Sequence, residues 1–320
     1  MWRGIVVWGD CRVIARWAMR SCRKSSGRHT SGLVLAGGLA VLAPLMVGVV
    51  LAGGPSAVAA AQLFGRPVRP VLDANGHGPA RIANQVETSN WSGYVVARFE
   101  TGHSYTSASG TWVVPTASQP SPGAPGYSAS WVGIGGFCKN ARCHAVDNTL
   151  IQLGTEQDVN ALGATTYGAW YEMLPNAPVP IPVVVVSPGD TVTATLSDGA
   201  VRRHGPKKAD DWTLTFTDVT TNKTWSTHVA YRSSLASAEW IQEAPASGRG
   251  ILPLADYGTA TFDPGSANGA NPDLLASQAV VMVDPQGQTS NPSAPDADTD
   301  GFATCWGSGV TLMACPAPAT

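Results

Sequence analysis

The feature that most constrains the fold of this chain is an alternation of polar and apolar residues with a period of two. It is clearest in "DTVTATLSD" (190–198) and "DWTLTFTDVT" (211–220). Side chains that alternate in this way point to opposite faces of a β-strand. Turn-forming residues border the two runs, in "SPGD" (187–190) and "TTNK" (220–223). These segments therefore predict antiparallel hairpins.

Short runs rich in Val, Ile, Thr and aromatic residues fill most of the chain after residue 87. They are "NWSGYVVARF" (90–99), "YTSASGTWVVP" (105–115), "YSASWVGIGG" (127–136), "TLIQLGT" (149–155), "TTYGAWYEMLP" (165–175), "VPIPVVVVSPGDTVTATLSD" (179–198), "DWTLTFTDVTTNKTWSTHVAY" (211–231), "AEWIQEAP" (238–245), "YGTATF" (257–262) and "SQAVVMVD" (277–284). Residues 286–300 are expected to form a loop, and no segment past residue 62 carries a helical stripe of useful length. Only 13% of residues are charged, while Gly (35) and Pro (24) are abundant, which disfavours long helices. The sequence therefore predicts an all-β fold, a two-sheet antiparallel β-sandwich.

The first 61 residues have the pattern of a secretory signal peptide. A basic segment precedes an apolar run over 32–54, and the small residues "AVAAA" (57–61) follow it. The run is also long enough to be a retained membrane anchor, which is the one way in which we expect the protein to contact a membrane. On the signal-peptide interpretation, the protein is secreted to the extracellular space.

The remainder of the chain is acidic. Residues 1–61 hold 7 of the 20 Lys/Arg and 1 of the 22 Asp/Glu, so the rest has 13 basic and 21 acidic residues, a net charge of −8. This negative net charge argues against a nucleic-acid partner. We also expect the protein to be a monomer. Residues 62–86 are rich in Pro, Gly and Arg, and we interpret them as a propeptide or flexible basic arm before a domain over 87–320. Such an arm would cover an acidic groove at neutral pH and leave it when the carboxylates are protonated.

Four cysteines follow the signal segment, an even number in a chain that we expect to be exported. Disulfides are the natural interpretation. Cys138 lies close in sequence to Cys143, and Cys305 to Cys315. We expect these two disulfides, although four cysteines can be paired in three different ways. The spacings do not match a zinc pattern, so no metal is expected.

Common hydrolase signatures are missing from the sequence. It has no Gly-x-Ser-x-Gly, no His-Glu-x-x-His and no pepsin-type Asp-Thr-Gly loop. What remains is a set of polar residues inside apolar strands. Gln152 shares a strand face with Leu150, and Glu172 shares one with Trp170. Glu239 and Glu243 share a face of their strand about 13 Å apart.

Each of these residues also has an ordinary structural interpretation. A strand glutamate often lies on a solvated face, and a glutamine among aliphatic residues is more often a structural hydrogen-bonding group than a catalyst. Several such residues in a domain with few charges nevertheless favour a polar groove lined by Trp, Glu and Gln.

Six motifs resemble, in order, those of the G1 family of glutamic peptidases, the eqolisins. They are "SNWSGY" (89–94), "SWVGIGG" (130–136), "LIQLGT" (150–155), "YGAWYEMLP" (167–175), "VSPGD" (186–190) and "AEWIQEAP" (238–245). The resemblance spans nearly all of 87–320. It implies a secreted, acid-active endopeptidase that cleaves polypeptides, with a lectin-like (concanavalin A, jelly-roll) β-sandwich fold and no cofactor.

The resemblance also assigns roles to individual residues. Glu243 corresponds to the family's catalytic glutamate and Gln152 to its catalytic glutamine, while Glu239 is a neighbouring structural residue. Trp131, Trp170 and Glu172 correspond to positions that line the substrate groove. A carboxylate can activate a water, and an amide can hold that water and donate to the oxyanion.

The sequence departs from the family pattern at three places. Gly135 stands where the family often has an acidic residue, and Leu174 where it often has an aromatic one. The segment after the glutamine offers Glu156 and Asp158 instead of the usual residues. These changes bear on subsite preference more than on the reaction.

Two alternatives follow from the residues without the resemblance. One is a secreted carbohydrate-binding sandwich that uses its tryptophans as a sugar platform. The other is a glycoside hydrolase on the same fold, which would need two apposed carboxylates. Glu172 and Glu243 are the nearest candidates for such a pair.

Overall fold

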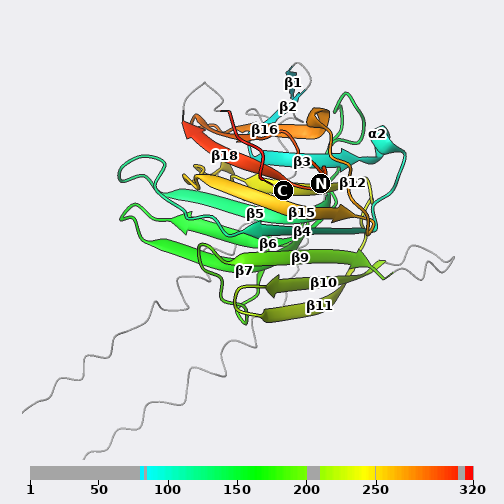
Figure 1. Ribbon diagram of the computed structural model, residues 1–320, viewed down its shortest axis with the longest axis horizontal. Helices are drawn as coiled ribbons and strands as arrows, with labels where there is room; N and C mark the ends of the chain where they lie inside the picture. The colour runs from blue at the N-terminus through cyan, green and yellow to red at the C-terminus, as the bar shows by residue number, and fades with distance from the viewer. Residues whose placement is uncertain (1–79, 83–84, 200–209, 249, 309–313, 320) are drawn as a thin grey trace, which may run out of the picture. The chain divides into compact units, whose positions relative to one another are not determined.

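Strands account for nearly all of the regular structure in the computed structural model (Figure 1). The structure describes residues 80–82, 85–199, 210–248, 250–308 and 314–319, all within one unit that spans 53–320. The predicted signal segment 1–61 and the first part of the predicted arm, 62–79, lie outside the described residues. Within the part that is described, no helix is long and apolar enough to cross a membrane.

The elements follow one another in this order: β1 (Ala80–Ile82), β2 (Gln85–Thr88), β3 (Trp91–Ala97), α2 (Arg98–Thr101), β4 (Ser107–Val113), β5 (Gly126–Gly135), β6 (Leu150–Val159), β7 (Thr165–Met173), β8 (Val179–Pro180), β9 (Thr191–Asp198), β10 (Asp210–Asp218), β11 (Lys223–Tyr231), β12 (Ser237–Glu243), β13 (Ala246–Ser247), β14 (Gly250–Ile251), β15 (Thr259–Ala267), η2 (Ala276–Gln278), β16 (Ala279–Val283), β17 (Gln288–Pro292) and β18 (Phe302–Ser308). The two described helices have four and three residues. The prediction of an all-β fold is confirmed.

The main sheet folds over on itself to form the two layers of a β-sandwich. Its strand order is β11-β10-β9-β4-β15-β18-β17-β16-β3-β12-β5-β6-β7-β8. The strands β4 and β9 of one half pack against β5 and β6 of the other, and β15 packs against β12. Pairing is antiparallel along this path, and only the pairing of β2 with β16 is parallel among the described strands. The predicted antiparallel sandwich is therefore confirmed.

Alternation within each strand divides the side chains between the core and the outer face. Trp112, Phe216 and Trp240 are among the fully buried aromatic side chains of the core between the layers. A second apolar cluster, which includes Trp91 and Trp131, lies on the other face of β3, β12, β5, β6 and β7. This outer face carries the candidate site.

Two segments differ from the sequence prediction. The loop predicted over 286–300 is wrong for Gln288–Pro292, which forms β17 between β16 and β18. Its polar sequence "QTSNP" resembles a turn, but Ser290 is buried and hydrogen-bonded to the Tyr257 hydroxyl. Conversely, the valines of 183–186 form no strand. The prolines that border these valines have no backbone N–H to donate to a neighbouring strand.

The predicted arm over 62–86 overlaps the sheet. β1 and the first residues of β2 fall within this range, and β2 pairs with β16. The boundary placed at Glu87 therefore cuts through a strand.

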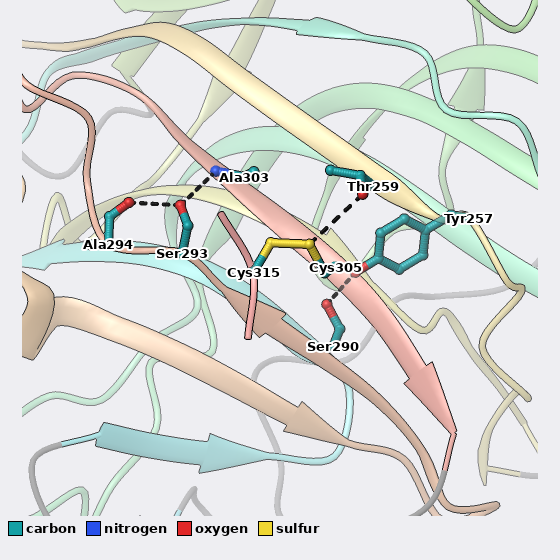
Figure 2. The surroundings of a disulfide bond; sticks show 8 residues. All are labelled: Tyr257, Thr259, Ser290, Ser293, Ala294, Ala303, Cys305 and Cys315. Atoms are coloured by element: carbon teal, nitrogen blue, oxygen red, sulfur yellow. Dashed lines mark hydrogen bonds between the residues drawn. A yellow bond between two sulfur atoms is a disulfide. The ribbon is translucent and has the colours of Figure 1, made fainter. Parts of the chain in front are cut away.

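Both predicted disulfides are present. Cys138 is bonded to Cys143 with a Cα–Cα distance of 4.8 Å, and Cys305 to Cys315 with 5.4 Å. Figure 2 shows the second bond beside the pair Tyr257 and Ser290. It attaches the segment around Cys315 to β18.

Candidate active site

The register of four neighbouring strands brings the predicted site residues together on one face. In β12, Glu239, Ile241 and Glu243 point to the outer face, whereas Trp240 lies in the core between the layers and Gln242 accepts a hydrogen bond from Ser130. The alternation predicted for this strand is confirmed. Pairing with β5, β6 and β7 then places residues of those strands in rows across the same face.

One row contains the predicted glutamine. Glu239 lies opposite Gly133, Gly133 opposite Gln152, and Gln152 opposite Glu172. The Gln152 amide Nε2 donates a hydrogen bond of 2.7 Å to Glu172 Oε2. The amide Oε1 of Gln152 is buried without a hydrogen-bond partner among the described residues. Glu172 thus fixes the orientation of the amide and leaves its oxygen free.

The next row holds the tryptophans. Ile241 lies opposite Trp131, Trp131 opposite Gly154, and Gly154 opposite Trp170. A Cβ atom on Gly154 would lie 2.4 Å from the Ser130 carbonyl oxygen and 2.5 Å from Trp131 Cβ. Only glycine fits beside Trp131 here, which explains the glycine in "LIQLGT".

Glu243 lies one row further along, held by an indole. The Trp131 Nε1 donates a hydrogen bond of 2.6 Å to Glu243 Oε2. Trp91 packs edge-on against Trp131, with ring centroids 4.9 Å apart. Burial raises the pKa of Glu243 well above its usual value, the hydrogen bond from Trp131 opposes that shift, and the charge of Glu172 adds to it. Glu243 Oε1 is buried without a partner among the described residues.

Glu239 differs from Glu243 in its hydrogen bonding. It is also fully buried, but neither of its carboxylate oxygens has a hydrogen-bond partner of ordinary length and angle among the described residues. Burial raises the pKa of Glu239 well above its usual value, the nearby Ser237 hydroxyl opposes that shift, and the charge of Asp147 adds to it. Glu239 lacks the indole N–H donor that favours the charged form of Glu243.

Two further carboxylates surround this face. Glu156 lies in the row of Glu243, with Ala129 between them. Burial and then the charge of Asp158 raise the pKa of Glu156 well above its usual value. The face is therefore crowded with acidic groups that protonate readily.

Asp147 and Trp91 belong to the site, although sequence reasoning did not select them. Asp147 is 2% exposed and accepts hydrogen bonds from Thr149 and from the Ser234 hydroxyl. A Cβ atom on Gly135 would lie 3.4 Å from Asp147 Oδ2. Asp147 thus brings a carboxylate next to the position where the sequence lacks the family's acidic residue. Its signal was weak, because it stands in a loop.

Comparison with known proteins identifies the family. Residues 89–302 match the Peptidase A4 family. The chain belongs to this family. Aspergillopepsin-2 of Aspergillus niger is 28% identical over 230 residues, which cover 66% of this chain and 74% of that protein. The predicted resemblance to the G1 glutamic peptidases is confirmed, and so is the hydrolase class.

Solved structures of glutamic peptidases are also similar to this chain. A complex of scytalido-glutamic peptidase with a transition-state analogue inhibitor aligns with a TM-score of 0.47 and 19% identity, covering 68% of this chain and 98% of the other. Aspergilloglutamic peptidase from Aspergillus niger aligns with a TM-score of 0.39 and 21% identity, covering 57% and 99%. The family match disfavours the carbohydrate-binding and glycosidase alternatives.

Proposed function

We propose that this Peptidase A4 protein is an acid-active endopeptidase whose catalytic pair is Glu243 and Gln152. The observation that carries the proposal is the hydrogen bond from the Trp131 indole to Glu243 Oε2, which Glu239 lacks. Glu243 Oε1 and Gln152 Oε1 are buried and unpartnered among the described residues. Because buried polar atoms are nearly always hydrogen-bonded, free ones mark places where water or substrate binds.

The two groups suit the hydrolysis of a peptide bond. A water held between them loses a proton to the Glu243 carboxylate as its oxygen attacks the carbonyl carbon. The carbonyl oxygen becomes an oxyanion, and Gln152 donates a hydrogen bond to it. Glu243 then transfers the proton to the leaving nitrogen as the C–N bond breaks. An amide has two N–H donors, so Gln152 can contact Glu172 and the oxyanion together.

The protonation of the site would restrict activity to acidic pH. Glu239, Glu243 and Glu156 all have raised pKa values. Only Glu243 has the Trp131 hydrogen bond that favours its charged form. The active state would be Glu243 ionised while its neighbours remain protonated. Such a coupled group of carboxyls predicts a bell-shaped pH profile.

Substrate binding falls to the aromatic and acidic residues around the pair. Trp131 lies in the row between those of Glu243 and Gln152. Trp170 Nε1 is buried without a partner among the described residues and offers a donor to a substrate carbonyl. Glu172 orients Gln152.

We also propose that the protein acts outside the cell, with residues 1–61 as its signal. A propeptide would end before β1, because the predicted boundary at Glu87 cuts through β2. The two disulfides support an oxidising compartment.

The proposal is tested by digestion of an unfolded protein substrate across about pH 2–7. The processed enzyme should cleave at acidic pH in the presence of a pepsin inhibitor and of a chelator. Lack of cleavage at every pH would refute the function. A glycan-binding screen on the same preparation tests the carbohydrate-binding alternative.

A further inference from the structure

A second group of carboxylates lies far in sequence from the residues of the proposed catalytic pair. Asp263 belongs to β15, and Asp296 and Asp300 belong to the loop between β17 and β18. One oxygen from each of the three side chains lies within 4.8 Å of the others. β15 and β18 are neighbours in the sheet, which brings these residues together.

Asp296 is the observation that points to a ligand. This side chain is only 7% exposed, and its Oδ2 is buried with no hydrogen-bond partner among the described residues. Its Oδ1 accepts a hydrogen bond of 3.2 Å from the Gly301 N–H. A buried carboxylate with a free oxygen beside two other carboxylates is costly unless a proton or a cation neutralises it.

Gly301 leaves space for this arrangement. A Cβ atom at this position would lie 2.2 Å from Asp296 Oδ2 and 2.9 Å from Asp263 Cγ. Any larger residue would therefore push the two carboxylates apart. The backbone here is also anchored, because Gly265 N–H donates to the Asp300 carbonyl at 2.8 Å.

The spacing of the loop residues matches a known cation-binding pattern. Residues 296–301 read "DADTDG", which is Asp-x-Asp-x-Asp-Gly. In calcium loops, alternate acidic residues at positions 1, 3 and 5 supply oxygen ligands, and a glycine at position 6 permits the sharp turn. Position 12, usually a bidentate Glu, is Gly307 here, and no helices flank the loop among the described residues. Asp263 from β15 stands in place of that missing carboxylate.

We propose that Asp263, Asp296 and Asp300 form a calcium site that ties the β17–β18 loop to β15. All three ligands are hard oxygen donors, which suit Ca²⁺ or Mg²⁺ rather than Zn²⁺. Three carboxylates at one point favour Ca²⁺, which takes six to eight oxygen ligands in flexible geometry, whereas Mg²⁺ usually retains several waters and is bound by one or two carboxylates.

The electrostatics agree with this assignment. Three carboxylates each place an oxygen within 4.8 Å of the others, and Lys and Arg side chains are absent from this group of described residues. Negative charge is therefore crowded at this point, and a divalent cation would relieve the repulsion. The site stabilises the fold and takes no part in the proposed chemistry, so its test does not depend on peptidase activity.

Calorimetric titration of the purified full chain with CaCl2 at pH 7, after chelator treatment, tests the site directly. We expect saturable binding of one Ca²⁺ per chain. Calcium at about 100 times its Kd should raise the Tm on the order of 5–10 °C. MgCl2 at the same concentration should give a much smaller shift.

Asp296→Asn is the matched variant, since it keeps the shape of the side chain and the oxygen that accepts from Gly301. It should fold and, in chelator, be as stable as the wild type, because a buried charge is removed. Its calcium affinity should fall at least tenfold. Asp211→Asn, on β10 and outside the loop, should retain the full response. No binding heat and no Tm shift in the wild type would overturn the proposal, as would an undiminished response in Asp296→Asn or an equal response to Mg²⁺.

Discussion

At the scale of single residues, the hydrogen bond from Trp131 is what separates the two glutamates of β12. Glu239 and Glu243 are both fully buried on one face, and burial raises the pKa of each. Only Glu243 receives the indole N–H, at 2.6 Å. An N–H donor favours the charged form of a carboxyl, which is why we propose Glu243 as the base.

Trp131→Phe should therefore shift the acidic limb of the kcat/KM profile to higher pH. Removing the donor raises the pKa of Glu243 further, so less of the base is ionised at a given acidic pH. Since a hydrogen bond to a charged group contributes about 1.5–3 kcal/mol, kcat/KM below the limb should fall about tenfold or more. Trp170→Phe is the control for the position of the limb: it removes an indole N–H that contacts no carboxylate among the described residues, so it should lower kcat/KM through substrate binding without shifting the limb. An unshifted limb in Trp131→Phe would contradict this role.

The sequence identified these residues only in part. Alternation alone placed Gln152, Glu239 and Glu243 on strand faces, but gave no reason to prefer one glutamate. The resemblance supplied that preference. Asp147 was missed because a carboxylate in a loop has no periodic neighbours, and its burial depends on contacts with Ser234, distant in sequence.

At the scale of elements, β5 and β6 form the floor of the site, and glycines set how closely they approach the tryptophans. Gly154 lies opposite both Trp131 and Trp170. The strands themselves were predictable, because β-branched and aromatic residues alternate between turn signals. β17 was not predictable, since its pairing partners rather than its own polar residues make it a strand. The valines of 183–186 were expected to form a strand and do not. Their side chains do alternate, with Val183 68% and Val185 76% exposed, but no neighbouring strand among the described residues pairs with them.

Gly154→Ala should destabilise the protein by about 1–3 kcal/mol, as overpacking of a core does. The added methyl would meet the Ser130 carbonyl oxygen at 2.4 Å, which is backbone and cannot move aside cheaply. Urea unfolding measures the change. Gly248→Ala is the matched control, because nothing lies within 4 Å of its Cβ position. Equal free energies of unfolding for the two variants would show that a methyl group fits at position 154, which would contradict the close contacts of this glycine.

At the scale of the whole molecule, the stability of the described domain depends on protons bound to buried carboxyl groups on the outer face of the sandwich. The pKa of Glu156, of Glu239 and of Glu243 is raised in the folded protein. The folded state therefore holds more protons than the unfolded chain between the usual glutamate pKa and the raised values. In that window stability falls as pH rises.

Thermal unfolding in chelator should accordingly give a higher Tm near pH 4–5 than at pH 7. Each unit by which a folded pKa exceeds the unfolded value is worth about 1.4 kcal/mol below the unfolded pKa, and this is lost as pH rises through the folded pKa. Glu239→Gln should flatten the dependence, because a neutral amide replaces a buried titrating group. A Tm that rises steadily from pH 4 to pH 7 would contradict the raised pKa values.

The central claim, that Glu243 and not Glu239 is the working carboxylate, is tested most directly by comparing Glu243→Gln with Glu239→Gln. The two substitutions are chemically identical and lie four residues apart on one strand face. The measurement is kcat/KM for an unfolded protein substrate at the acidic optimum, after unfolding curves have shown that both variants are folded. We predict a loss of at least about 10³-fold in Glu243→Gln, as expected when a general base is removed, and a loss of less than about tenfold in Glu239→Gln. The reverse order would show that Glu239, which shares a row with Gln152, is the catalytic glutamate.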